Sequence, residues 1–229
     1  MAKSTFLELC KAARRACDIS GSGPVSVLGQ VGELENLVEW VALADQETQS
    51  RWFDWDFLHV STWSTNTIIG VATVIAPADI GTWDEESFYL NYTTASNQSL
   101  SVLDYRAWRK AFRQGVKVNS KPSSVVIKSD LSLVLESPPD AIYSLSADYW
   151  RRPVKMAANT DTSLIPEEYE RIIISRAKMM YAEFSGSGVL LSSAQIEFDD
   201  LLDKLEAKYL SGHKARRMMS ADQMVVRVE

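Results

Sequence analysis

Histidine and cysteine, which often carry nucleophilic or metal chemistry, are scarce in this sequence. The chain has two histidines, His59 and His213, and two cysteines, Cys10 and Cys17. A hydrolytic triad needs a histidine beside a nucleophile and a carboxylate, and neither histidine lies in a Gly-x-Ser-x-Gly or comparable context. The four residues lack the spacing of a zinc site, and no glycine-rich phosphate loop is present. The sequence therefore predicts no catalytic residue, no metal ligand and no cofactor.

Carboxylates near tryptophans give the one alternative that involves chemistry. The acidic residues are Asp54, Asp56, Asp84, Glu85 and Glu86, and the tryptophans are Trp52, Trp55, Trp63 and Trp83. Glycoside cleavage needs two carboxylates at a defined separation, which a sequence does not give. A carbohydrate-binding or glycan-cleaving tail module is therefore one hypothesis. The other interpretation is that the tryptophans fill the core of a β-rich module while the acids solvate its loops.

The C-terminal segment combines a basic cluster with apolar residues that follow no hydrophobic period. These residues are Lys214, Arg216, Arg217, Met218, Met219, Met224, Val225, Val226 and Val228. A frayed end is the ordinary expectation for a terminus. Residues 223–228 nevertheless have strand character suited to the sheet edge or groove of a partner. On this pattern alone, plain disorder and a partner-binding arm both stay open.

Composition narrows the class of protein. With 229 residues, 46% of them hydrophobic, the chain has enough apolar surface for one domain or two small ones. The net charge of −6 gives no broad attraction to nucleic acid. The sequence shows no signal peptide and no apolar run long enough for a membrane helix. Cys10 and Cys17 fall on one expected helix, about 10 Å apart along its axis, which predicts reduced, buried thiols.

Four amphipathic helices are expected, two at each end of the chain. The first begins with a capping box at Thr5 and Glu8, and the second covers residues 32–51. The third covers residues 164–184, with Pro166 in its first turn and an apolar stripe that ends at Phe184. The fourth begins at a capping box formed by residues 192–195 and ends at Gly212.

Between the helices, the hydrophobic period changes from near 3.6 to 2 at Trp52. The expected strands cover residues 55–63, 67–75, 87–93, 125–128, 131–135 and 141–150. A short helix is expected over residues 103–114, with Asp104 as its N-cap. The turn at residues 138–140 predicts a hairpin between the last two strands.

This layout predicts an α+β fold with three parts. The chain ends form an antiparallel-type four-helix bundle over residues 1–51 and 160–212. Residues 52–159 form a β-rich insertion, either a small barrel or a sandwich. Residues 213–229 form an extended C-terminal arm.

Several short segments resemble the adaptor proteins of tailed phages, the head-to-tail connectors that lie beneath the portal. Near the N-terminus they are residues 5–10, 18–21, 29–33 and 38–41. Later ones are Pro-Pro-Asp at 138–140 with Tyr143 and Tyr149, then residues 152–153, 159–162 and 164–169. The resemblance covers both helical ends and the expected last hairpin, whereas residues 68–121 match nothing.

The resemblance implies a structural virion protein and not an enzyme. Such adaptors assemble as a ring, usually of twelve copies, and in several relatives the C-terminal segment reaches the portal. The implied partners are the portal protein, a tail or second adaptor (nozzle) protein, further copies of this chain, and genomic DNA that passes through the lumen without specific binding. No membrane is implied. The expected location is the virion neck, after assembly in the host cytoplasm. A tail terminator or stopper protein is a further alternative.

Overall fold

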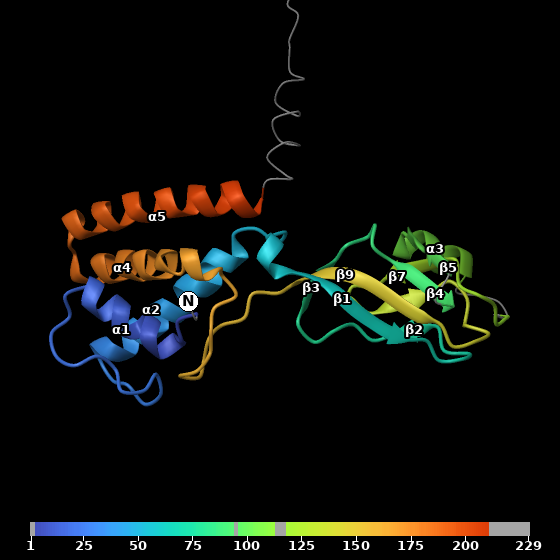
Figure 1. Cartoon of the computed structure of the whole chain (residues 1–229), viewed down its shortest axis with the longest axis horizontal. Coiled ribbons are helices and arrows are strands. Elements are labelled where there is room, and N and C mark those ends of the chain that lie inside the picture. Colours follow the sequence, from blue (N-terminus) through green and yellow to red (C-terminus); the bar gives the residue numbers. More distant parts are fainter. Residues whose placement is uncertain (1–2, 94–95, 113–117, 211–229) are drawn as a thin grey trace, which may run out of the picture. The chain divides into compact units, whose positions relative to one another are not determined.

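A computed structural model describes residues 3–93, 96–112 and 118–210 of the chain (Figure 1). The chain divides into two compact units. The helical unit contains the chain up to Phe57 and again from Pro153 onward, and the β unit contains residues 58–152. Each unit has its own core. The fold is therefore mixed α+β, with the strands placed between N-terminal and C-terminal helices.

Four long helices make up most of the helical unit. They are α1 (Phe6–Ala16), α2 (Glu33–Ser50), α4 (Arg171–Ser185) and α5 (Gly188–Tyr209). Helix α4 packs against α1, α2 and α5, and α1 also packs against α2. The two helical ends of the chain thus contact one another. Their shared core contains Phe6, Leu9, Leu37, Val41, Ile172, Ile173 and Ala177.

Local signals fix the start of α1. The Thr5 hydroxyl accepts a hydrogen bond from the Glu8 amide, and the Glu8 carboxylate accepts one from the Thr5 amide at 2.8 Å. This capping box was predicted and is confirmed. Cys10 and Cys17 are buried free thiols, also as predicted. Burial raises the pKa of Cys10 to about 12 and that of Cys17 to about 11.

The C-terminal helices differ from the prediction at their starts. Pro166 precedes a short 3₁₀ turn (Glu167–Tyr169), and α4 begins only at Arg171. Helix α5 begins at Gly188, where the Ser187 hydroxyl accepts from the Leu190 amide, so the expected capping box at residues 192–195 is wrong. Phe184, expected on the buried stripe, is exposed. It packs on the Trp40 ring at 5.5 Å instead.

The segment that returns from the β unit is tied to the start of the chain. The Asp161 carbonyl accepts from the Phe6 amide, and the Asn159 carbonyl accepts from the Leu7 amide. The Asn159 side chain also accepts from the Val27 amide at 2.7 Å. The Asp161 carboxylate accepts from the amides of residues 157 and 158, which lower its pKa. These contacts account for the asparagine and the aspartate of the Asn-Thr-Asp-Thr motif at residues 159–162.

The β unit has two open sheets. The first contains β1 (His59–Asn66), β9 (Ser144–Arg151), β4 (Tyr89–Thr93) and β5 (Ser96–Ser99) in that order, and β3 (Ile80–Trp83) also pairs with β9. The second has the order β2 (Thr73–Val74), β8 (Leu133–Leu135), β7 (Ser124–Ile127) and β6 (Ser101–Leu103). All described pairs are antiparallel except β6 with β7. The predicted small barrel is wrong, because neither sheet closes.

Strand β9 is the centre of the first sheet. Its side chains alternate between buried and half-buried, as a strand with one face on the core requires. Leu145, Ala147 and Tyr149 meet Leu90 of β4 and Trp83 of β3 in one core. Val125, Leu133 and Leu135 of the second sheet complete the same core. The two sheets therefore share one apolar interior.

Two predicted strand features are wrong. Residues 131–135 and 141–150 do not form a hairpin, because β8 pairs with β2 and β7 while β9 belongs to the other sheet. Residues 67–75 form no long strand, because the chain turns at Gly70, whose φ is +77°. Only Thr73–Val74 of that range is a strand. The short helix α3 (Tyr105–Phe112) follows the prediction, and the Asp104 carboxylate accepts from the Ala107 amide at 2.8 Å.

Within the described part of the chain, no helix has both the length and the apolar character that a membrane crossing requires.

Candidate functional site

The predicted partner-binding residues, from Lys214 to Val228, lie outside the residues that the structure describes. What the structure does describe is the end of α5, the helix that precedes them in the sequence. We call this point the arm anchor and define it as Arg51, Trp52, Phe57, Glu168, Tyr169, Glu206, Lys208 and Tyr209. Sequence reasoning missed it, because its members come from three distant segments.

Tyr209 is the centre of the arm anchor. Its ring meets the Phe57 ring edge-on at 5.8 Å and the Tyr169 ring edge-on at 6.1 Å. Its hydroxyl donates to the Glu168 carboxylate at 3.1 Å, and the Lys208 ammonium donates to the same oxygen at 2.5 Å. The Lys208 hydrogen bond lowers the pKa of Glu168, whereas burial of the phenol raises the pKa of Tyr209. The last turn of α5 is thus held by aromatic contacts and by one shared carboxylate.

One turn earlier, Glu206 joins α5 to the end of α2. Its carboxylate accepts from the Trp52 indole at 2.9 Å and forms an ion pair with Arg51 at 3.4 Å. Trp55, which follows Trp52 in the sequence, is fully buried, and its ring stacks on the Phe57 ring with centroids 5.1 Å apart. These contacts hold the last turns of α5 against the end of α2.

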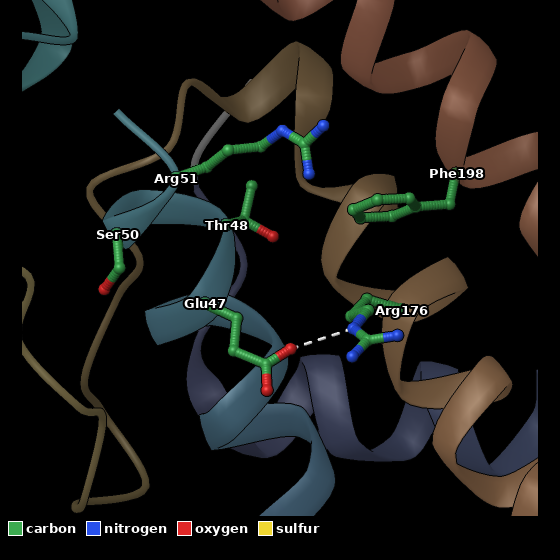
Figure 2. Close-up of a pocket in the computed structure, with 6 residues that line it drawn as sticks. All are labelled: Glu47, Thr48, Ser50, Arg51, Arg176 and Phe198. Atoms are coloured by element: carbon green, nitrogen blue, oxygen red, sulfur yellow. Dashed lines mark hydrogen bonds and ion pairs between the residues drawn. The ribbon is translucent and has the colours of Figure 1, made fainter. Parts of the chain in front are cut away.

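An open cleft of about 410 Å³ lies between α2, α4 and α5. Figure 2 shows its lining residues: Glu47, Thr48, Ser50, Arg51, Arg176 and Phe198. The Arg176 guanidinium forms an ion pair with Glu47 at 2.9 Å. The hydroxyls of Thr48 and Ser50 donate to helix carbonyls four residues earlier. The lining therefore contains an ion pair and two hydroxyls that are hydrogen-bonded to the helix backbone. Its six residues include no nucleophile paired with a general base.

The tryptophans and acids of the glycan hypothesis are divided between the two units. Trp52 and Trp55 belong to the helical unit, whereas Trp63 and Trp83 belong to the β unit. Trp83 is buried in the core, and its indole donates to the Leu131 carbonyl at 2.8 Å. Trp63 packs on Trp83 with ring centroids 4.8 Å apart. Of these two β-unit tryptophans, Trp83 is a core residue, as the second interpretation expected, and Trp63 is half-buried against that core.

The structure brings together three potential ligand groups that the sequence did not connect. His59, Asp84 and Asp148 have ligand atoms within 4.8 Å of one another. His59 faces Asp148 at 3.7 Å, and an Asp84 carboxylate oxygen accepts from the Glu86 amide. The Asp84 amide also donates to the Asp148 carbonyl. The His59–Asp148 contact and the turn at Asp84 account for this arrangement, and among the described residues no fourth ligand joins it.

Comparison with known proteins gives the family. Residues 4–226 match the family model described as SU10 adaptor protein, so the match covers nearly the whole chain. No curated protein matches the sequence. The matched range includes both units except Lys3 among the described residues, and most of the sequence after α5. The chain therefore belongs to the SU10 adaptor protein family, a family of phage head-to-tail adaptors.

Proposed function

We propose that copies of this chain form a closed ring, of about twelve subunits, between the portal and the tail of a phage. The ring holds the two parts together in the virion neck and lets genomic DNA pass through its lumen. It assembles in the host cytoplasm, and the chain acts as a structural part and not as an enzyme. The observation that carries the proposal is the family match over residues 4–226.

Residues 214–228 serve as the arm that binds the portal, with Lys214, Arg216 and Arg217 for charged contacts and the methionines and valines for apolar ones. The arm anchor supports this role. A binding segment whose first residue is held close to the target has a higher effective concentration there and therefore binds more tightly. The bonds of Tyr209 and Glu206 hold the end of α5, which precedes the arm in the sequence, on the helical unit.

A truncation tests the arm. A chain that ends after residue 213 is expected to keep the helicity and unfolding temperature of the full chain but to lose binding to purified portal rings. Binding is measured by sedimentation of the portal complex. A full-length variant with Met224, Val225 and Val226 all changed to Ser keeps the basic residues but lacks these apolar side chains. It therefore separates the contribution of apolar contacts to portal binding from that of charge. Undiminished portal binding by the truncated chain would remove the arm from the proposal.

Nothing in the described residues favours the glycan-module alternative. A tail terminator or stopper role predicts binding to tail tubes in preference to portal rings, so the same sedimentation assay with tail tubes separates it from the adaptor role.

A further inference from the structure

The helical unit carries two exposed faces of opposite charge, and we infer that they join neighbouring subunits. The α5 face consists of Val189, Ile196, Asp199 and Asp203. The loop face consists of Lys11, Arg15, Val25, Leu28 and Val31. We propose that the α5 face of one copy packs against the loop face of the next. This inference rests on the proposed ring and names the surfaces that close it.

The α5 face is the side of α5 that its own chain leaves uncovered. Ala194, Leu202 and Leu205 are buried on the opposite side, which packs against α4. Val189 is 86% exposed and Ile196 is 72% exposed. Seven residues separate Val189, Ile196 and Asp203, so they lie on one side of the helix at intervals of two turns. Asp199 and Asp203 form no ion pair with any described residue, whereas Asp200 pairs with Lys204.

The loop face surrounds the connection between α1 and α2. The Arg14 guanidinium holds this connection by donating to the Ile19 carbonyl at 2.6 Å and to the Gly21 carbonyl. Gly23 lies so close to α1 that a Cβ there would be 3.1 Å from Cγ of Lys11. The Val27 amide is bound to Asn159 at 2.7 Å. The connection between α1 and α2 is thus held in place by contacts with α1 and with Asn159.

Despite this fixing, the connection presents apolar side chains to solvent. Val25 is 86% exposed, Leu28 is 68% exposed and Val31 is 81% exposed. Lys11 and Arg15 of α1 are also exposed, and Gly23 of the connection lies against Lys11. Neither cation has an ion pair with a described residue within 4 Å, and the acid that acts on Lys11 is Glu8 of the same helix. Apolar residues next to unpaired positive charge complement the apolar and acidic α5 face.

The two faces cannot meet within one copy. Helix α4 packs against α5 on one side and against α1 and α2 on the other. Figure 1 shows α5 and the α1–α2 connection at opposite sides of the helical unit. Two α5 faces would bring acid against acid, and like charges across an interface cost several kcal/mol. The occupant of each face is therefore the other face of another copy, which is a head-to-tail contact of the kind that closes rings.

Crosslinking tests this contact. Leu28→Cys and Ile196→Cys are made as separate full-length variants, and each is treated with a short bismaleimide linker. The native thiols do not interfere, because Cys10 and Cys17 are buried and their pKa values are raised to about 12 and 11. Each variant alone is expected to give no covalent dimer, because its two copies bring only one cysteine to each contact, and their mixture is expected to give covalent dimers. A chain that carries both cysteines should give a ladder of higher multimers, and Val154→Cys in place of Leu28→Cys serves as the matched control.

Charge reversal adds a test that does not depend on the linker. Asp199→Lys with Asp203→Lys, in the Ile196→Cys chain, should lower the yield of crosslinked dimer about tenfold or more. Lys11→Glu with Arg15→Glu in the Leu28→Cys partner should restore it. Variants are compared after their unfolding temperatures are shown to match. A yield no higher than that of the Val154→Cys control, or dimers of a single variant with itself, would overturn the contact. Portal binding that persists in that case would leave the proposed function standing.

Discussion

Asp45 is a carboxylate with no exposed surface, placed in the middle of α2. The Ser163 hydroxyl donates to it at 2.5 Å, and the Lys3 ammonium donates to the Ser163 carbonyl at 2.7 Å. Burial raises the pKa of Asp45 to about 6, although the Ser163 hydrogen bond opposes the rise. Asp45 thus joins α2 to the segment around Ser163, but its charged form is destabilised because the carboxylate is removed from water.

This cost predicts a pH dependence. The folded pKa is about 6, above the ordinary value of 3.8, so the folded state binds the proton more tightly than the unfolded state. The contribution of Asp45 to stability is full below about pH 4 and is lost as the pH rises through 6. The free energy of unfolding should fall by about 3 kcal/mol from this group. Asp45→Asn should remove that fall, as measured by urea unfolding at pH 4, 5, 6 and 7.

Glu183→Gln is the matched control for this prediction, because Glu183 is an exposed acid of α4. Its pH profile should equal that of the unmodified chain. An Asp45→Asn profile that keeps the full decline between pH 4 and 7 would show that another group causes it.

Individual residues were predictable where their role is local. The Thr5–Glu8 capping box and the Asp104 cap depend on spacings of three residues, and both form as predicted. Phe184 was misplaced because its exposure depends on where α5 and Trp40 lie, which the period of α4 does not contain. Asp45 was not singled out, because nothing local marks a buried carboxylate whose partner lies 118 residues away.

At the scale of elements, two helices end in the left-handed conformation with different residues. Gly186 follows α4 with φ of +70°, and Asp18 follows α1 with φ of +53°. The amides of Asp18 and Ile19 donate to the carbonyls of Arg15 and Arg14, so the turn after α1 has the Schellman pattern. Glycine adopts this conformation without strain, whereas aspartate does not.

Exchanging these residues should change stability in opposite directions. Gly186→Ala should lower the free energy of unfolding by about 1 kcal/mol. Space around Gly186 is open, so the loss is conformational and not steric. Asp18→Gly should raise the free energy of unfolding by about 0.5–1 kcal/mol. Thermal unfolding of the two variants measures both changes in the free energy of unfolding. If both variants were stabilised, or both destabilised, the explanation given for the helix ends would be contradicted.

The arm anchor makes a further prediction for α5. Tyr209→Ala removes two edge-on ring contacts and should lower the free energy of unfolding of the α5 end by about 2 kcal/mol. Tyr209→Phe keeps the rings and should lower it by less than about 1 kcal/mol. Hydrogen exchange of the amides in residues 203–209 measures the difference. Equal exchange in the two variants would show that the rings do not hold this turn.

Strand pairing was less predictable than helix position. Near the expected turn at residues 138–140, the chain bends at residues 136–137 and 140–141, and the Tyr143 hydroxyl donates to the Asp140 carboxylate at 2.6 Å. The strand after it nevertheless pairs with β1, β3 and β4, which lie far from it in sequence. A turn sequence predicts a change of direction, but long-range packing of residues such as Leu145 and Leu90 chooses the partner strand.

For the whole molecule, the arrangement that matters is the contact between the two helical ends. Amphipathic stripes predicted four helices that need partners, and α4 does meet α1, α2 and α5. The family match adds the biological role, which no catalytic or ligand-binding group could have indicated. The proposed surfaces between subunits could not be predicted from the sequence, because only the packed structure shows that Val189 and Leu28 are exposed.

The measurement that tests the account most directly is the native mass of the complex formed when the full chain is mixed with portal rings of its own phage. The account predicts one mass, that of the portal ring plus a closed set of about twelve adaptor chains. Portal rings that keep their own mass beside monomeric chains, or that bind chains in a broad, unclosed distribution, would contradict it.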